Sequence, residues 1–437
     1  MKIHFFCARN IEDYRKIYRD RIEASKSPNE LLLEDFEQKF FLTYIKKLFK
    51  LPQEIWKARI FNETGIEGLR FDFNFGLRLD VPEGNFRVKI SDAETGQIFF
   101  DKNISDVRLL SFEQYFIHWR IEVFLDGARV FEHTLNLAGQ KVMIAFIFNA
   151  LGDLIALLPF VREFKRRHGC ELSICLHDYM SEFVAQLYPE IPQAEKINFK
   201  TYATYYPLML VSDYPTAPTD MRNTPLNRMA GAILGLNIIP PKPIFRPTAQ
   251  RICREPYVCV GVQASMPIKG WLYPNGWEII INYLKSLGYR VFCIDKEKFK
   301  SKGNYSISMP TNAEDFTGDF SIMERANMLY HAEFFIGLSS GLSWVADVVN
   351  CPVVMICGFS QDWFEFYTPY RVANRLVCNG CLNDIRVNFI AELCPYHKGT
   401  ARELECQKKI SPRQVINAIE QLIIDRNLTP PILRASQ

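Results

Sequence analysis

Residues 141–169 constrain the fold of this chain more than any other stretch. The segment begins with an apolar run, Val142 to Phe148, which is long enough for one buried β-strand. A turn with Gly152 and Asp153 follows, and apolar side chains then recur at helical spacing until Gly169, which is expected to end the helix. A strand, a tight turn and a helix form the corner at which open α/β sheets bind ligands, because the helix N-terminus offers free N–H groups and partial positive charge.

Asp153 lies in this corner, and two interpretations fit it equally well. A carboxylate beside the start of a helix commonly caps the helix N-terminus. A carboxylate at the mouth of a cleft can instead act as a general base. The segment alone is compatible with both roles.

The composition is that of an ordinary soluble protein with ample core material. Of 437 residues, 48% are hydrophobic and 23% are charged, and this length suggests two or three domains. The net charge of +3 argues against a nucleic-acid binder that works by bulk charge. No apolar run reaches membrane-spanning length, and the N-terminal residues lack the apolar core of a signal peptide. We therefore expect a cytoplasmic protein without a membrane span.

Changes in the hydrophobic pattern divide the chain into four regions. Residues 1–60 form an N-terminal segment with helical patterns, whereas residues 61–138 alternate apolar and polar side chains and predict an antiparallel β-domain of about six strands. Strands and helices then alternate over residues 139–240, and the alternation restarts over residues 250–425 after a linker with four prolines. The fold class is therefore α/β, with two Rossmann-like domains that face each other across a cleft.

Three stretches of the second Rossmann-like domain lie where strands are expected to end and helices to begin. The first holds Lys269, whose charge can pair with a diphosphate, although this stretch alone slightly favours a solvated surface lysine. The second stretch, around Thr317 and Gly318, can hold a base or ribose, and the third, from Ser339 to Gly341, can hold a phosphate, through main-chain and hydroxyl groups. An ordinary turn with a helix cap, such as Asp319 or Ser321 in the second stretch, explains each of them too. Neither a GxGxxG nor a Walker A motif is present, so dinucleotide and P-loop chemistry are unsupported. The candidate donor-site residues are Gly152, Gln263, Ser265, Lys269, Thr317, Gly318, Ser339, Ser340 and Gly341.

A cysteine cluster near the C-terminus predicts a metal site. The chain has twelve cysteines, of which eight are scattered, mostly in apolar segments, and are expected to be buried thiols in a reducing compartment. A CxxC pair with two further cysteines can complete a tetrahedron around one structural ion, zinc or iron, with no open position for catalysis. Unrelated thiols are the alternative, and His397 and Cys357 are substitute ligands. The candidate ligands are Cys378, Cys381, Cys394 and Cys406.

Together these motifs resemble the ADP-heptose glycosyltransferases, which have a GT-B architecture of two Rossmann-like domains with the donor in the cleft. The family's first motif stands here as Leu151 to Leu154 with Pro159, and its Lys before a Trp stands as Lys269 and Trp271. The third motif, Gly-Asp-Thr-Gly-x-x-His, corresponds to the segment from Gly337 to Trp344, where the family's Asp, Thr and His are replaced.

The β-domain and the cysteine cluster are similar to those of one branch, the autotransporter heptosyltransferases. The resemblance covers roughly residues 60 to 425. It implies inverting transfer of heptose from ADP-heptose to serine hydroxyls of an autotransporter adhesin in the cytosol of a Gram-negative bacterium. It also implies iron in a four-cysteine metal finger over residues 378–406, no catalytic divalent metal, and a large homo-oligomer, with the family suggesting a dodecamer.

In this scheme the first Rossmann-like domain takes the acceptor and the second takes the donor. Asp153 would deprotonate the acceptor hydroxyl, and Lys269 would balance charge on the leaving ADP. One rival is a lipopolysaccharide-core heptosyltransferase with a sugar acceptor, against which the altered third motif, the β-domain and the metal finger speak. Another is a non-catalytic scaffold that uses the β-domain and the finger to bind a partner.

Overall fold

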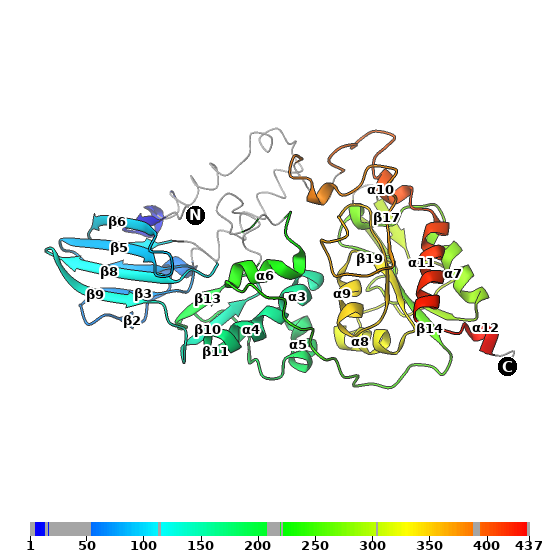
Figure 1. Ribbon diagram of the computed structural model, residues 1–437, viewed down its shortest axis with the longest axis horizontal. Helices are drawn as coiled ribbons and strands as arrows, with labels where there is room; N and C mark the ends of the chain where they lie inside the picture. Colours follow the sequence, from blue (N-terminus) through cyan, green and yellow to red (C-terminus); the bar gives the residue numbers. More distant parts are fainter. Residues whose placement is uncertain are drawn as a thin grey trace.

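The computed structural model describes residues 5–13, 16, 54–111, 115–207, 219, 222–302, 305–387 and 394–434. Most of the N-terminal segment that we expected to be helical, within residues 1–60, lies outside the described residues. The β-domain and the two Rossmann-like domains follow one another along the long axis of the molecule (Figure 1).

The first domain is antiparallel, as its alternating pattern predicted, and its strands form two sheets. In the described residues the first sheet has the order β1-β7-β4-β3-β2 and the second β6-β5-β8-β9, so the estimate of about six strands was too low. Inward-facing side chains such as Val88, Ile90 and Val123 are fully buried. The strands are β1 Phe6–Ala8, β2 Asn62–Glu63, β3 Arg70–Asp72, β4 Arg78–Val81, β5 Phe86–Asp92, β6 Ile98–Ile104, β7 Val107–Leu110, β8 Trp119–Leu125 and β9 Ala128–Thr134.

Backbone pairing joins the β-domain to the first Rossmann-like domain. The N–H of Phe73 donates to the carbonyl of Tyr202 at 2.9 Å, and the N–H of Thr204 donates to the carbonyl of Phe73 at 3.1 Å. Beside this pairing, the buried Arg78 guanidinium makes an ion pair with the buried Asp72 carboxylate. The two main-chain hydrogen bonds stabilise this junction, because breaking them would leave backbone polar groups unpaired.

The first Rossmann-like domain is a parallel sheet of order β12-β11-β10-β13 in the described residues. Strand β10 has sequence-later strands on both sides, so the crevice at its carboxyl end is the topological switch point. The segment after it, predicted as one helix, forms two, because Pro159 has no N–H to continue the first. The elements are β10 Lys141–Ala145, α3 Leu151–Leu157, α4 Pro159–His168, β11 Glu171–Cys175, η2 Asp178–Met180, α5 Ser181–Leu187, β12 Gln193–Ala194, β13 Ala203–Tyr205 and α6 Leu226–Leu234.

The second Rossmann-like domain is a parallel sheet of order β18-β15-β14-β19-β20-β21, with its switch point at β14. Its helices α8 and α11 begin with capping boxes at Ser321 and Ser411, and Pro412 is the first residue of α11. The main elements are β14 Tyr257–Gly261, η5 Pro267–Lys269, α7 Gly276–Ser286, β15 Arg290–Cys293, β18 Glu314–Asp315, α8 Ile322–His331, β19 Phe335–Leu338, α9 Gly341–Val348, β20 Val353–Ile356, β21 Arg371–Val372 and α11 Pro412–Asp425.

Shorter elements decorate this domain. The hairpin of β16 Phe299–Lys302 and β17 Tyr305–Ser308 was not predicted from the sequence. The cysteine cluster lies around η6 Cys381–Asn383 and α10 Glu405–Lys408, and the described chain ends in α12 Pro431–Arg434.

Candidate active site and metal centre

The two Rossmann-like domains meet where α3 and α9 begin (Figure 1). A Cβ atom on Gly152 would lie 2.6 Å from Cδ1 of Trp344, and a Cβ on Gly341 would lie 2.8 Å from the Leu151 side chain. Real Cβ atoms do not approach this closely, so both glycines are required for the contact between the helices. Two residues that we expected at the donor therefore lie in the contact between the two domains, where Trp344, in place of the family's His, packs against Gly152.

Asp153 lies in the first turn of α3, and the helix cap is Ala150, which makes no side-chain capping bond. The cap interpretation of Asp153 is therefore wrong. Its carboxyl group is half-buried at the domain boundary, and desolvation by burial raises its pKa. The positive charge of Lys269 lowers this pKa and the negative charge of Glu365 raises it. Both groups belong to the second domain, so charges from across the cleft act on Asp153.

Lys269 ends the short turn η5, at the edge of the second domain that faces Asp153. Its ammonium group lies 5.7 Å from the ring centre of the buried Phe359 and is half-buried. An aromatic face favours a desolvated cation at this place. The family's Trp has a different task, because the buried Trp271 donates to the carbonyl of Ile410 at 2.8 Å and belongs to the core.

The weaker donor candidates lie at the carboxyl ends of β14 and β18. The side chain of Gln263 donates to the carbonyl of Glu297 at 2.7 Å, whereas Ser265 is exposed. The hydroxyl of Thr317 donates to Asp315 at 2.7 Å. Gly318 has a φ of 134°, which favours glycine, and its N–H donates to the carbonyl of Lys296 at 3.1 Å. The structure thus places these residues along one edge of the sheet, and two of them, Gln263 and Thr317, use their side chains for hydrogen bonds within the protein.

The buried carboxylate of Glu365, which the sequence did not indicate, acts on Asp153 from the second domain. The hydroxyl of Ser339 donates to Glu365, so this serine is engaged within the protein. Glu365 also accepts a hydrogen bond from Ser360 at 2.9 Å and pairs with Arg371 at 2.9 Å. Ser340 is the cap residue of α9 and makes no side-chain capping bond. Glu365 lies in a loop without periodicity, and the sequence carries no signal that would have found it.

The four cysteines of the cluster line one small cavity of about 10 Å³. Burial, together with the neighbouring thiols of Cys378 and Cys394, raises the pKa of Cys381 to about 12. Four thiols crowded in this way favour a cation, which binds thiolates and removes their mutual repulsion. The residues present therefore fit a metal ion. The cavity is lined by Cys378, Cys381, Cys394 and Cys406, together with Ile268, Asn379, Pro395, Tyr396, His397, Arg402 and Glu405.

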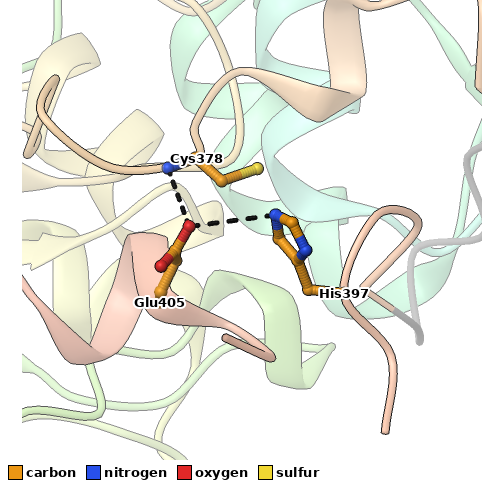
Figure 2. A group of neighbouring side chains, drawn as sticks. All are labelled: Cys378, His397 and Glu405. Atoms are coloured by element: carbon orange, nitrogen blue, oxygen red, sulfur yellow. Dashed lines mark hydrogen bonds and ion pairs between the residues drawn. The ribbon is translucent and has the colours of Figure 1, made fainter. Parts of the chain in front are cut away.

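Figure 2 shows a second group of ligand types at the same cavity, which consists of Cys378, His397 and Glu405. Their ligand atoms lie within 4.8 Å of one another. The Glu405 carboxylate accepts from the N–H of Cys378 at 3.1 Å, and Nε2 of His397 lies 3.8 Å from the same oxygen. His397 thus remains a substitute ligand, and Glu405 is a residue that the spacing of cysteines did not reveal. Cys357, the other substitute, instead contacts the hydroxyl of Ser360 at 3.1 Å.

None of the helices in the described parts of the chain has the length and apolar character needed to cross a membrane.

Known proteins resemble the chain in sequence over most of its length. Residues 65–127 match the family model described as the N-terminal domain of glycosyltransferase TibC. An autotransporter heptosyltransferase of Citrobacter rodentium, BAHTCr, is 39% identical over 82% of this chain and 90% of its own length. A relative from Burkholderia thailandensis, BimC, is 33% identical over 82% of this chain and 87% of its own length, and is described as an inactive autotransporter heptosyltransferase.

Solved structures of TibC from enterotoxigenic Escherichia coli are also similar. One, described as an iron-containing dodecameric glycosyltransferase, matches with a TM-score of 0.80 at 38% identity and covers 85% of this chain and 99% of its own. Another is a complex of TibC with ADP-D-β-D-heptose, which matches with a TM-score of 0.79 at 36% identity and covers 84% and 99%.

Proposed function

Since the chain belongs to the autotransporter heptosyltransferase family, we propose that it transfers heptose from ADP-heptose to serine hydroxyls of an autotransporter adhesin. The observation that carries the proposal is the pair of opposite charges at the cleft, Asp153 on the first domain and Lys269 on the second. A base on one side and a cation on the other are what an acceptor hydroxyl and a departing diphosphate require.

The reaction assigns a task to each side of the cleft. Asp153 removes the proton of the serine hydroxyl while its oxygen attacks the anomeric carbon, and the bond from that carbon to the diphosphate oxygen breaks. ADP leaves with the bonding electrons and carries the developing negative charge. Lys269 and the N-terminus of α9, where Ser340 and Gly341 lie, stabilise this charge. A fixed lysine and helix N–H groups can replace a catalytic divalent metal in this role.

The direct test is incubation of the purified protein with ADP-heptose and an adhesin passenger domain, followed by intact-mass measurement. Heptose added to the passenger supports the proposal. Heptose added to a lipopolysaccharide-core sugar instead would favour the sugar-acceptor rival, and neither transfer nor donor hydrolysis would favour a scaffold. The inactive description of BimC makes this measurement necessary, because family membership alone does not establish turnover.

The metal finger is proposed to be a structural cross-link with one ion per chain held by Cys378, Cys381, Cys394 and Cys406. Iron is favoured, because TibC is described as iron-containing, and zinc also suits four thiolates. When bound, the ion would tie the CxxC turn to α10. We also propose a large homo-oligomer, since TibC is described as dodecameric, and a place in the bacterial cytoplasm.

Replacing Lys269 with alanine should weaken ADP binding and slow transfer. The ammonium group is the cation that we assign to the diphosphate, and its position near Phe359 and the domain boundary desolvates it. Titration calorimetry with ADP measures the change in affinity. Lys285, an exposed lysine in the last turn of α7, provides a matched control. Equal affinities of the Lys269→Ala variant and the wild type would remove Lys269 from the donor site.

Replacing Glu365 with glutamine should move the acid limb of the pH–rate profile to lower pH. The negative charge of Glu365 raises the pKa of Asp153, whereas Lys269 lowers it, so removing Glu365's charge lowers the pKa. A base is active when deprotonated, and activity is lost as the pH falls through its pKa, so a lower pKa retains activity in more acidic solution. The measurement is kcat/KM against pH.

Two further variants control this experiment. Glu420→Gln removes a carboxylate on the far helix α11, where it contacts Tyr283, and should leave the profile in place. A double variant with Glu365→Gln and Arg371→Met removes the buried ion pair together, which avoids leaving one charge unpaired. An unshifted acid limb in both Glu365 variants would contradict the influence of Glu365 on Asp153.

A further inference from the structure

Arg222, which precedes α6 in the first Rossmann-like domain, inserts its guanidinium group into the metal finger of the second. Its Nε donates to the carbonyl of Leu382 at 2.7 Å, and Nη1 donates to the carbonyl of Val387 at 2.6 Å. Its Nη2 donates to the carbonyl of Cys381 at 3.0 Å and also to that of Asp384. One side chain from one domain thus satisfies four main-chain carbonyls of the turn that carries a candidate metal ligand.

The contact is reciprocal and continues into the body of both domains. The side-chain amide of Asn383 donates to the carbonyl of Arg222 at 2.6 Å, and the side-chain oxygen of Asn383 accepts from the N–H of Gln361 at 2.8 Å. The N–H of Leu226, at the start of α6, donates to the carbonyl of Phe364 at 2.8 Å. These hydrogen bonds connect α6 to the turn of the metal finger at residues 381–387, called the finger turn, and to the loop that carries Glu365. In Figure 1 the orange finger segment accordingly reaches back toward the first domain.

We propose that Arg222 is a positioning residue that couples metal binding in the finger to the closed arrangement of the two Rossmann-like domains. Four carbonyls converge on Arg222 only while residues 381–387 keep their turn, and the metal would hold Cys381 at the beginning of that turn. The guanidinium in turn holds the turn in the shape that presents the Cys381 thiol to the cavity. Each event therefore favours the other, and the coupling free energy is the same in both directions.

Arginine suits this position for a geometric reason. Its planar group presents five N–H donors in a fixed fork, whereas lysine has a single ammonium group with three donors. The three guanidinium nitrogens of Arg222 together donate to four carbonyls of the finger turn. A lysine at this position would reach only part of that set.

The test compares wild type, Arg222→Ala and Arg222→Lys, each purified as the full chain and loaded with Zn²⁺. Release of the ion to a chromogenic chelator gives the rate, and hydrogen exchange gives the protection of the Leu226 N–H. We expect Arg222→Ala to weaken zinc retention by roughly 10- to 100-fold, the loss typical when an outer-shell partner of a metal ligand is removed. Arg222→Lys should fall between the two, and it keeps the test usable where the alanine variant does not fold.

Because the coupling acts in both directions, removal of the metal should also change the protection of the Leu226 N–H. A purely structural role of Arg222 would not predict this change. Chelation of zinc from the wild type should deprotect the Leu226 N–H as much as Arg222→Ala does, and chelation of the variant should add little more. Arg228→Ala, which removes an exposed arginine on α6 itself, is the matched control and should retain zinc as the wild type does.

The inference rests on the proposed metal site, and the outcomes separate the two. A wild type that binds no metal would sink the metal site itself. A wild type that binds zinc, with both Arg222 variants releasing it at the same rate, would overturn the coupling and leave the metal site standing. Zinc lost faster without any change at Leu226 would also overturn it, because Arg222 would then act on the finger alone.

Discussion

Replacing Asp153 with asparagine should lower the rate of heptose transfer by about 10²- to 10⁴-fold, the range that a general base supplies. The amide cannot accept the serine proton, yet it has nearly the same shape, so ADP-heptose should bind with little change. Burial raises the pKa of Asp153, which makes its carboxylate a stronger base than an exposed aspartate. The measurement is single-turnover transfer to an adhesin passenger, with donor affinity determined separately.

The role of Asp153 as a base also predicts how the transfer rate depends on pH. Asp153 works as a base in its deprotonated form, so wild-type activity should fall as the pH is lowered through the raised pKa, and this acid limb should be absent from the residual activity of the variant. Asp178→Asn is a matched control, because Asp178 is an exposed carboxylate of the same domain. Near wild-type turnover in Asp153→Asn would contradict the role of Asp153 as the general base and leave it only a structural role in the first turn of α3.

Local patterns in the sequence predicted the elements of this fold, since each depends on a few neighbouring residues. The candidate cap Ser321 located the beginning of α8, and the strand-turn-helix order located the corner that holds Asp153. The break between α3 and α4 could have been foreseen from Pro159, whose missing N–H ends a helix ladder. The hairpin at residues 299–308 carries no such local signal.

Relations between distant segments could not be predicted in this way. The motif glycines Gly152 and Gly341 were expected to approach the donor, and the structure shows that each also makes room for a side chain of the opposite domain. Glu365 and Arg222 act through partners far away in the sequence, at Ser339 and at the finger turn. Only the three-dimensional arrangement brings such pairs together, so periodicity and spacing are silent about them.

Replacing any one of Cys378, Cys381, Cys394 and Cys406 with serine should lower bound metal and make the protein poorly soluble. The segment around these residues has few large apolar side chains, so a loop of this length needs a cross-link to hold its fold. The four side chains line one cavity, so they can bind a single ion. A closed thiolate site can contribute on the order of 10 kcal/mol of apparent binding free energy. Metal analysis of the purified wild type should find about one iron or zinc per chain.

A matched control distinguishes loss of the ion from loss of a thiol. Cys175→Ser removes a half-buried thiol on β11, far from the finger in sequence, and should change metal content and solubility much less than Cys381→Ser. The finger variants that stay soluble should transfer heptose with a normal chemical step, because four thiolates leave no open coordination position for the substrate. Their assembly should nevertheless be disturbed, which light scattering would measure. A fully active, metal-free wild type would turn these four residues back into ordinary thiols, and the raised pKa of Cys381 would then reflect burial and crowding without a metal.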